Sequence, residues 1–211
     1  MYISRVEVDT EDRTKIRDLT HVGAFHSWVE DSFPDEKNEI RTRKLWRMDK
    51  LHGKDYLTIV SQSIPDKDML ERYGVKNTAA TKDYEPFLNS IKDGDRMFFK
   101  VTLNPVISKS EGVGNRGRVV PCKDDKSRMD YLMERAEKNG FELNFEEFTI
   151  AEKGVLILKK AKSSNIKFVK SVYQGKLTVS DAEKFREMLS QGIGKHKAYG
   201  FGLMSVIHMV D

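Results

Sequence analysis

The sequence GIGKHKAYGFG occupies residues 192–202, directly after a segment with strong helix signals and directly before an apolar run. Each glycine lacks a Cβ and can adopt positive φ, so main-chain N–H groups there can close around an anion. We call residues 192–202 the glycine loop and expect it to hold phosphates of a nucleic-acid backbone. The residues predicted to make this contact are Gly192, Gly194, Lys195, His196, Lys197, Gly200 and Gly202.

A simpler interpretation of the loop is a helix C-cap followed by a tight turn. It would explain Gly192 and Gly194, but it leaves unexplained the second pair, Gly200 and Gly202, which flanks a basic and aromatic segment. A nucleotide-binding P-loop does not fit, because its consensus is absent and because a P-loop precedes a helix rather than following one. The pattern therefore argues against an NTPase.

The segments on either side of the glycine loop predict a regular order of elements. A capping box at residues 180–183 opens a helix that runs to Leu189, and a final strand follows at 203–210. Before them come a strand beginning at Val119, a helix from Asp124 or Asp125 that Asn139 and Gly140 close, and further strands. These further strands cover residues 141–150, 154–158 and 168–179. The second half thus approximates the order β, α, β, β, α, β.

The first half of the chain predicts the same order. A strand at residues 2–8 precedes a long helix, which Asp12 caps and Pro34 ends. The remaining predicted elements are strands at 40–48 and 56–64, a short helix at 66–73 and a strand at 97–103. The repeated order predicts an α+β fold of two tandem ferredoxin-like (βαββαβ) domains. We expect these domains at 1–104 and 119–211, joined at 105–118 by an exposed linker or mobile loop that contains Pro and Gly.

The composition limits the classes of function. The 211 residues include 37 Lys and Arg against 33 Asp and Glu, a formal net charge of +4 that permits a basic face without demanding nucleic acid. Cys122 is the only cysteine, which excludes an intrachain disulfide and argues against a cysteine-based zinc site. The longest uncharged stretch, 198–210, is too short to cross a bilayer. We expect a cytoplasmic protein with no bound metal, no small-molecule cofactor and no membrane contact.

Two of the five histidines, His21 and His26, fall in the predicted first helix. His26 lies near the middle of its apolar face, which indicates a packed residue, whereas His21 lies roughly 120° away and is free to meet a substrate. No histidine or carboxylate follows His21 at i+4 on its own face, so acid–base chemistry fits better than a metal site. Asp18, one turn earlier, could orient the ring. Either residue could equally be an ordinary surface residue.

An imidazole with a pKa near neutrality can exchange a proton with an RNA hydroxyl group. The 2′-hydroxyl would then attack the neighbouring phosphorus and leave a 2′,3′-cyclic phosphate and a 5′-hydroxyl. DNA lacks this nucleophile and would not be cut. His21 therefore predicts a metal-independent endoribonuclease.

Basic residues gather at two further places in the second half. A predicted hairpin carries Lys159, Lys160, Lys162 and Lys167 near its tip, and Arg116, Arg118 and Lys123 flank the predicted linker. Such ribbons can lie along a nucleic-acid backbone. Each group alone could be ordinary surface charge, but together with the glycine loop they favour RNA.

The glycine loop matches the signature of CRISPR-associated RAMP proteins, in which two Gly-hydrophobic-Gly units are five residues apart. Residues 191–203 resemble the CasE endoribonuclease family of the type I-E Cascade complex, and residues 1–4, 21–26 with Phe33-Pro34, and 104–106 also fit that family. The resemblance implies tandem ferredoxin-like domains and cleavage of precursor CRISPR RNA within each repeat. It also implies retention of the stem-loop product and assembly with other Cascade subunits.

The family's catalytic histidine corresponds to His21. Some relatives carry a tyrosine where this chain has Asp18, so an auxiliary role does not carry over to that position. The family's basic hairpin, which grips the repeat stem, corresponds to Lys159, Lys160 and their neighbours.

Two other classes of function remain open at the level of sequence. A non-catalytic RAMP-type subunit that scaffolds a guide RNA would use the same glycine loop, with His21 incidental. A protein-interaction module whose loop contacts an acidic partner fits the sequence less well.

Overall fold

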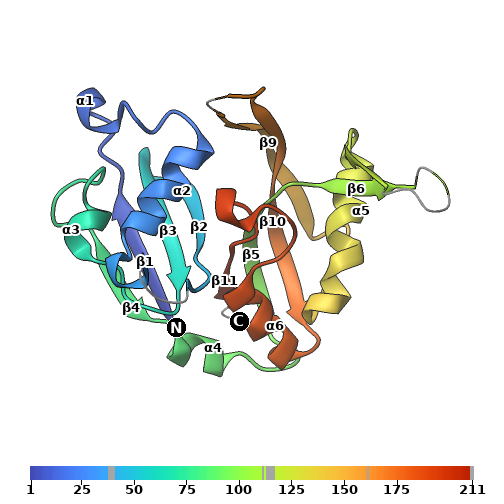
Figure 1. Ribbon diagram of the computed structural model, residues 1–211. Helices are drawn as coiled ribbons and strands as arrows, with labels where there is room; N and C mark the ends of the chain where they lie inside the picture. Colours follow the sequence, from blue (N-terminus) through green and yellow to red (C-terminus); the bar gives the residue numbers. More distant parts are fainter. Residues whose placement is uncertain (38–40, 111, 113–116, 161, 210–211) are drawn as a thin grey trace.

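The computed structural model describes residues 1–37, 41–110, 112, 117–160 and 162–209. These residues form two larger antiparallel sheets side by side and a separate two-stranded ribbon (Figure 1). The first sheet has the strand order β2-β3-β1-β4. Its strands are β1 (Tyr2–Glu7), β2 (Leu45–Leu51), β3 (Lys54–Ser61) and β4 (Ala80–Asp83). Helix α2 (Val22–Asp31) follows β1, and the short helix α3 (Lys67–Leu70) precedes β4. This is the ferredoxin-like order, in which the first and third strands are central.

The second sheet repeats that order with β11-β5-β10, and β9 pairs with the other edge of β10. Its strands are β5 (Arg96–Leu103), β8 (Phe141–Glu142), β9 (Phe148–Leu158), β10 (Ile166–Val179) and β11 (Met204–His208). Helix α5 (Asp125–Ala136) follows β5, and helix α6 (Ala182–Gln191) precedes β11. The short 3-10 turns are η1 (Pro34–Lys37), η2 (Glu137–Asn139) and η3 (Lys197–Tyr199). The fold is therefore α+β with two tandem ferredoxin-like units, which confirms the predicted fold class.

One strand lies in a different unit from the one predicted. Residues 97–103 were expected to close the first sheet, but β5 pairs with β10 and β11 in the second. The first sheet is closed instead by β4, a short and fully exposed strand with little hydrophobic pattern. On this topology we propose that the units divide between β4 and β5, around α4 (Glu85–Ser90), rather than at 105–118.

Part of the predicted linker is ordered as a ribbon. Strand β6 (Val106–Lys109) pairs with β7 (Arg118–Pro121), and the ribbon extends away from the second sheet in Figure 1. The strand expected to begin at Val119 thus belongs to this ribbon, and β5 takes its place as the first strand of the second unit. The local sequence, Arg-Val-Val-Pro, has strand propensity but does not specify which partner it pairs with.

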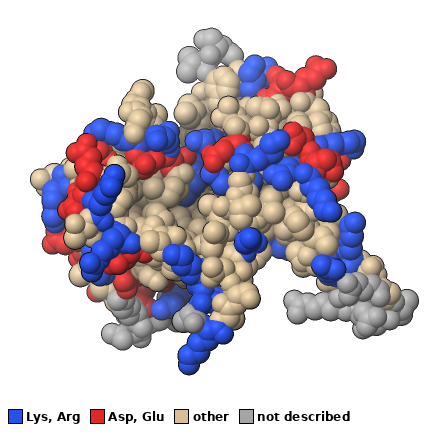
Figure 2. Space-filling view, turned by 90° about the horizontal axis from the view of Figure 1, so that it is seen from above, with Lys and Arg blue, Asp and Glu red and all other residues tan. Residues whose placement is uncertain are grey.

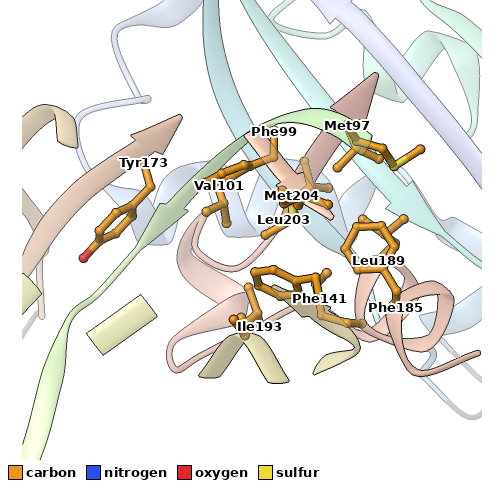
Figure 3. Close-up of a cluster of buried hydrophobic side chains, with 14 of the residues drawn as sticks. Met97, Phe99, Val101, Phe141, Tyr173, Phe185, Leu189, Ile193, Leu203 and Met204 are labelled. Carbon is orange, nitrogen blue, oxygen red and sulfur yellow. The ribbon is translucent and has the colours of Figure 1, made fainter. Parts of the chain in front are cut away.

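Two hydrophobic cores stabilise the units, and both cross the boundary between them. The core beneath the second sheet includes Met97, Phe99, Phe141 and Phe185, as Figure 3 shows, and it also contains Leu45 from the first unit. A second core beneath α2 contains Phe168 and Phe201 from the second unit, among other residues. Because side chains of both units share each core, we infer that the boundary is a packed interface. No helix within the described part of the chain is long and apolar enough to span a membrane.

The predicted helix between Asp12 and Phe33 is interrupted. Asp12 does cap α1 (Arg13–Ile16), where its side chain accepts hydrogen bonds from the amides of Thr14 and Lys15. That helix ends after one turn, and α2 begins only at Val22. His21 sits between them in an extended conformation, with φ −163° and ψ 162°. A periodic apolar pattern continued across the interruption, so the sequence pattern alone could not reveal it.

Candidate functional site

His21 is the N-cap of α2, rather than a residue on a helix face. Its Nδ1 accepts a hydrogen bond of 3.0 Å from the amide of Gly23. The acceptor role is normally filled by Ser, Thr, Asp or Asn, whose short side chains reach the unpaired amides of the first turn. The ring is half-buried, and its Nε2 has no protein partner among the described residues. The position of His21 is thus set by backbone geometry at the start of α2.

The start of α2 lies against the end of β9 in the second unit. A Cβ built on Gly23 would lie 2.8 Å from Cε1 of His21 and 2.8 Å from Cδ1 of Leu158. Next to it, Nζ of Lys159 donates a hydrogen bond of 3.1 Å to Oγ1 of Thr20. The structure therefore brings His21 and Lys159, which the sequence had placed in separate domains, to one place on the molecule.

Asp18 does not share a helical turn with His21. The chain leaves the α-helix after residue 16, so the i, i+3 spacing that suggested contact between the two side chains does not apply. The carboxylate of Asp18 is exposed and lies 3.6 Å from Nε of Arg17. The expected role of Asp18 in orienting the ring therefore has no geometric support.

His26 lies one and a half turns further along α2. Its ring is half-buried and meets the ring of Tyr199 edge-on, with centroids 5.7 Å apart. This contact joins α2 to η3 of the glycine loop. His26 is thus a packing residue at the boundary of the units, although it is not fully buried as expected.

The glycines of the glycine loop are needed for packing. All four have φ between 74° and 87°, which is the left-handed region that favours glycine. A Cβ on Gly192 would lie 2.7 Å from Leu45, and one on Gly200 would lie 2.9 Å from Trp46. These contacts are with β2 of the first unit. The signature that suggested a phosphate cradle therefore also specifies close packing of the two units.

The loop uses several of its own amides in internal hydrogen bonds. The amide of Ile193 donates to Gly202 O, and the amide of Gly202 donates to Thr102 O. Within the described residues, the amides of Gly194 and Lys195 have no such partner. Of the expected amide donors to an anion, we therefore keep Gly194 and Lys195 as candidates and assign Gly202 to the structure of the loop.

Hydrogen bonds from β2 fix the loop against the first unit. Nε1 of Trp46 donates to Ala198 O at 2.9 Å. Nη1 of Arg47 donates to Leu203 O at 2.9 Å and to Lys100 O at 2.8 Å, while its Nη2 donates to Asp49. Burial of the Asp49 carboxylate opposes its ionisation, but the charges of Arg47 and Lys100 prevail and lower its pKa.

A further basic residue, Arg43, which the sequence analysis missed, lies close enough to Lys197 of the glycine loop to affect its pKa. Arg43, two residues before the buried Leu45, is exposed, and its charge contributes to the lowered pKa of Lys197, after burial, which is the larger cause. Lys197 turns back and donates to Gln191 O at 2.8 Å. Lys195 is exposed. Arg43 belongs to the first unit, and only the packing of β2 against the loop brings it to the lysines.

His196 is held in the left-handed region at φ 62°. The centre of its ring lies 4.5 Å from that of Phe168, and its Nδ1 is buried without a hydrogen-bond partner in the part of the chain that the structure describes. Burial, and then the neighbouring charge of Lys195, lower the pKa of His196. We therefore expect a neutral ring at physiological pH, so His196 would contact RNA by hydrogen bonding or stacking rather than by charge.

The remaining predicted contacts lie on two ribbons. Lys160, Lys162 and Lys167 are exposed at the tip of the β9–β10 hairpin, as is Lys159. On the other ribbon Arg118 is exposed and pairs in register with Lys109, and Lys123 is exposed just beyond β7. Arg116 lies outside the described residues. Figure 2 shows Lys and Arg at the lower middle and lower right of the face seen from above, whereas Asp and Glu are mixed with them across the upper part of that face.

The described residues contain no cluster of three or more His, Cys, Asp or Glu side chains arranged to hold a metal ion.

Comparisons with known proteins all point to one protein family. A family model described as CRISPR associated protein matches residues 1–208. The chain is also 25% identical to the CRISPR-associated endoribonuclease Cse3 of Thermus thermophilus over 217 residues, which cover 98% of this chain and 99% of that protein.

Solved structures share the fold. One is Thermus thermophilus Cse3 bound to an RNA representing a pre-cleavage complex, with a TM-score of 0.80 and 24% identity over 98% of each chain. Another is a chain of a CRISPR RNA-guided surveillance complex, pre-nicking, with a TM-score of 0.68 and 18% identity over 98% of this chain and 99% of that one.

Proposed function

The chain belongs to the family of CRISPR-associated proteins, and from this membership we propose that it is an endoribonuclease that cleaves precursor CRISPR RNA within its repeats. In the proposed reaction the 2′-oxygen of one nucleotide attacks the adjacent phosphorus, and the bond from phosphorus to the 5′-oxygen of the next nucleotide breaks. The 2′-hydroxyl loses a proton and the 5′-oxygen gains one. The products carry a 2′,3′-cyclic phosphate and a 5′-hydroxyl.

The observation that carries this proposal is the position of His21. Its ring stands at the start of α2 with Nε2 unpartnered among the described residues. Leu158, at the end of β9, borders the same space beside Gly23, and the ammonium group of Lys159 donates to Thr20, the residue before His21. An RNA strand held by the lysines of the hairpin would pass within reach of the ring. A histidine placed at a scissile phosphate typically contributes about 10²–10⁴-fold to the rate through proton transfer. In this proposal the reaction needs no metal ion, because the nucleophile is a hydroxyl group of the RNA itself.

Binding of the RNA is assigned to three groups of cations. The hairpin tip, with Lys159, Lys160, Lys162 and Lys167, would grip the repeat stem. The β6–β7 ribbon would contact the backbone through Lys109, Arg118 and Lys123. Arg43 and Lys195 would hold phosphates beside the glycine loop. Together these contacts would retain the stem-loop product after cleavage, giving a single turnover.

The partners beyond RNA follow from the resemblance and from the shared fold. A chain of a CRISPR RNA-guided surveillance complex has the same fold as this protein. We propose that the chain assembles with other Cascade subunits while it holds the processed RNA.

The test is a single-turnover cleavage assay with repeat-containing RNA in EDTA. We expect wild type to cut, His21→Ala to lose at least about 100-fold in rate with RNA affinity unchanged, and the control His52→Ala, an exposed histidine in the turn between β2 and β3, to keep its activity. RNA with a 2′-deoxy group at the scissile nucleotide should bind without being cut. Tight binding without cleavage by wild type would instead support the scaffold subunit, and cleavage that requires magnesium would overturn the mechanism.

A further inference from the structure

Gly23 lies where the ring of His21, the backbone of α2 and a side chain of the second unit meet. Its amide donates to Nδ1 of His21 at 3.0 Å, and the space beside its Cα is shared by Cε1 of His21 and Cδ1 of Leu158. A side chain at this position would come within 2.9 Å of Nδ1 itself. No other residue type leaves that space open.

The hydrogen bond from Gly23 selects one form of the imidazole ring. Nδ1 can accept a hydrogen bond only through its lone pair, so it carries no proton here. The proton of a neutral ring therefore lies on Nε2. While this bond stands, His21 offers the RNA an N–H donor and no lone pair. To take the 2′-hydroxyl proton, the ring would first have to leave the amide of Gly23.

Leu158 limits the space beside Gly23 from the second unit. It ends β9, one residue before Lys159, and it packs into the core beneath α2 with Phe168. The hairpin that carries the RNA-binding lysines thus also supplies a contact beside the ring. Because Leu158 and Gly23 come from different units, the position of the ring depends on how those units are packed.

We propose that Gly23 and Leu158 are positioning residues for His21, which hold the ring at the scissile phosphate, with its proton on Nε2, before proton transfer; the transfer itself follows once Nδ1 has left the amide of Gly23. This inference rests on the proposed role of His21 in cleavage. Neither positioning residue touches the RNA in this proposal. They act by keeping the ring in one place and in one tautomer before the RNA arrives.

The decisive variant is Gly23→Ala. The backbone of Gly23 is helical and accepts alanine, and the atoms that must move are ends of side chains, so the protein should fold. We expect the single-turnover rate to fall about 100-fold, as for a misplaced catalytic group. RNA affinity should stay unchanged, and the melting temperature should not fall, since alanine favours a helix more than glycine does. The matched control is Gly154→Ala in β9, where a Cβ would meet no atom within 4 Å.

A spectroscopic measurement tests the tautomer in the wild-type protein. Long-range ¹H–¹⁵N spectra of the free protein should show the proton of neutral His21 on Nε2, and Gly23→Ala should give a mixture of tautomers. A wild-type ring protonated on Nδ1, or a Gly23→Ala enzyme that cuts at the wild-type rate, would overturn the inference. If His21→Ala still cuts RNA, the catalytic proposal itself fails. If His21→Ala is inactive while Gly23→Ala is fully active, only the positioning role fails.

Discussion

The boundary between the two units has two regions that are built differently. Around Trp46 and Arg47 the side chains are buried, and each makes hydrogen bonds across the boundary. Around His21 and Leu158 the side chains are only half-buried, and the imidazole has a nitrogen without a partner among the described residues. A cavity of about 110 Å³, lined by residues that include Val22, Trp46 and Leu156, lies at this boundary. We infer that the first region holds the units together and that the second is left accessible for chemistry.

The largest expected effect on stability comes from Arg47→Ala. The side chain of Arg47 is 4% exposed, and removing it leaves the carbonyl groups of Lys100 and Leu203 without this donor and leaves Asp49 with Lys100 as its remaining ion-pair partner. Breaking a buried ionic network of this kind costs about 3–5 kcal/mol. Urea unfolding should show the loss, and Arg43→Ala, a nearby exposed arginine, should unfold like wild type. Equal stability of the two variants would mean that the Trp46 and Arg47 region does not hold the units together.

A smaller effect is expected for Trp46→Phe. Phenylalanine keeps much of the ring contact with Gly200 but cannot donate a hydrogen bond to Ala198 O. The unpaired carbonyl and the lost ring volume should cost about 1–3 kcal/mol in the free energy of unfolding. Thermal melts would detect this, with Trp28→Phe, which loses a similar bond to Met69 O within the first unit, as the matched variant. Both variants should unfold earlier, but only Trp46→Phe should lower RNA affinity as well, because it loosens the glycine loop.

Lowering the pH should destabilise the boundary around Trp46 and Arg47 by protonating Asp49. Its pKa in the folded protein lies below the usual 3.8, so its ionised form contributes stability above about pH 4, and this contribution is lost as the pH falls through the lowered value. Asp49→Asn should therefore reduce the free energy of unfolding at pH 7. It should also reduce the further drop in that free energy as the pH falls below about 4. Urea midpoints measured from pH 7 to pH 2.5 give the comparison. An unchanged acid profile in Asp49→Asn would show that another carboxylate dominates.

The smallest expected effect belongs to Arg43→Ala. The guanidinium group has no ion-pair partner among the described residues, so its removal should leave stability within about 0.5 kcal/mol of wild type. If it contacts one RNA phosphate, the slope of log affinity against log salt should fall by about 1. Filter binding at several salt concentrations measures that slope. An unaltered slope would remove Arg43 from the RNA-binding surface and leave the loop lysines to act alone.

The order of elements in each half could be predicted from the sequence because hydrophobic periodicity and capping residues are local signals. Asp124, one of the two residues expected there, caps α5, and α6 begins one residue later than the predicted capping box implies, with Asp181 and not Ser180 as its N-cap. Strand pairing is not local, and β5 was therefore assigned to the wrong sheet. Its apolar alternation fits either sheet equally well, and only the partners on β10 and β11 decide between them.

For the candidate site, the residue types could be identified from the sequence, but their arrangement could not. His21 and the lysines of the hairpin were named from the pattern and from the resemblance. Their proximity, and the approach of Arg43 to the glycine loop, come from packing between units that are far apart in the chain. Gly23 gave no signal, because a glycine at the start of a helix has no distinctive spacing.

By itself, the sequence determined most of the longer helices and strands, acidic residues that cap several of the helices, and a glycine signature near a basic hairpin. The tertiary structure alone decided that His21 caps a helix instead of facing solvent from its side, and that the glycines pack against Leu45 and Trp46. The physical reason is the separation in sequence over which each effect acts. Propensity and capping act within a few residues, whereas the position of a side chain at a shared interface depends on contacts between residues more than a hundred positions apart.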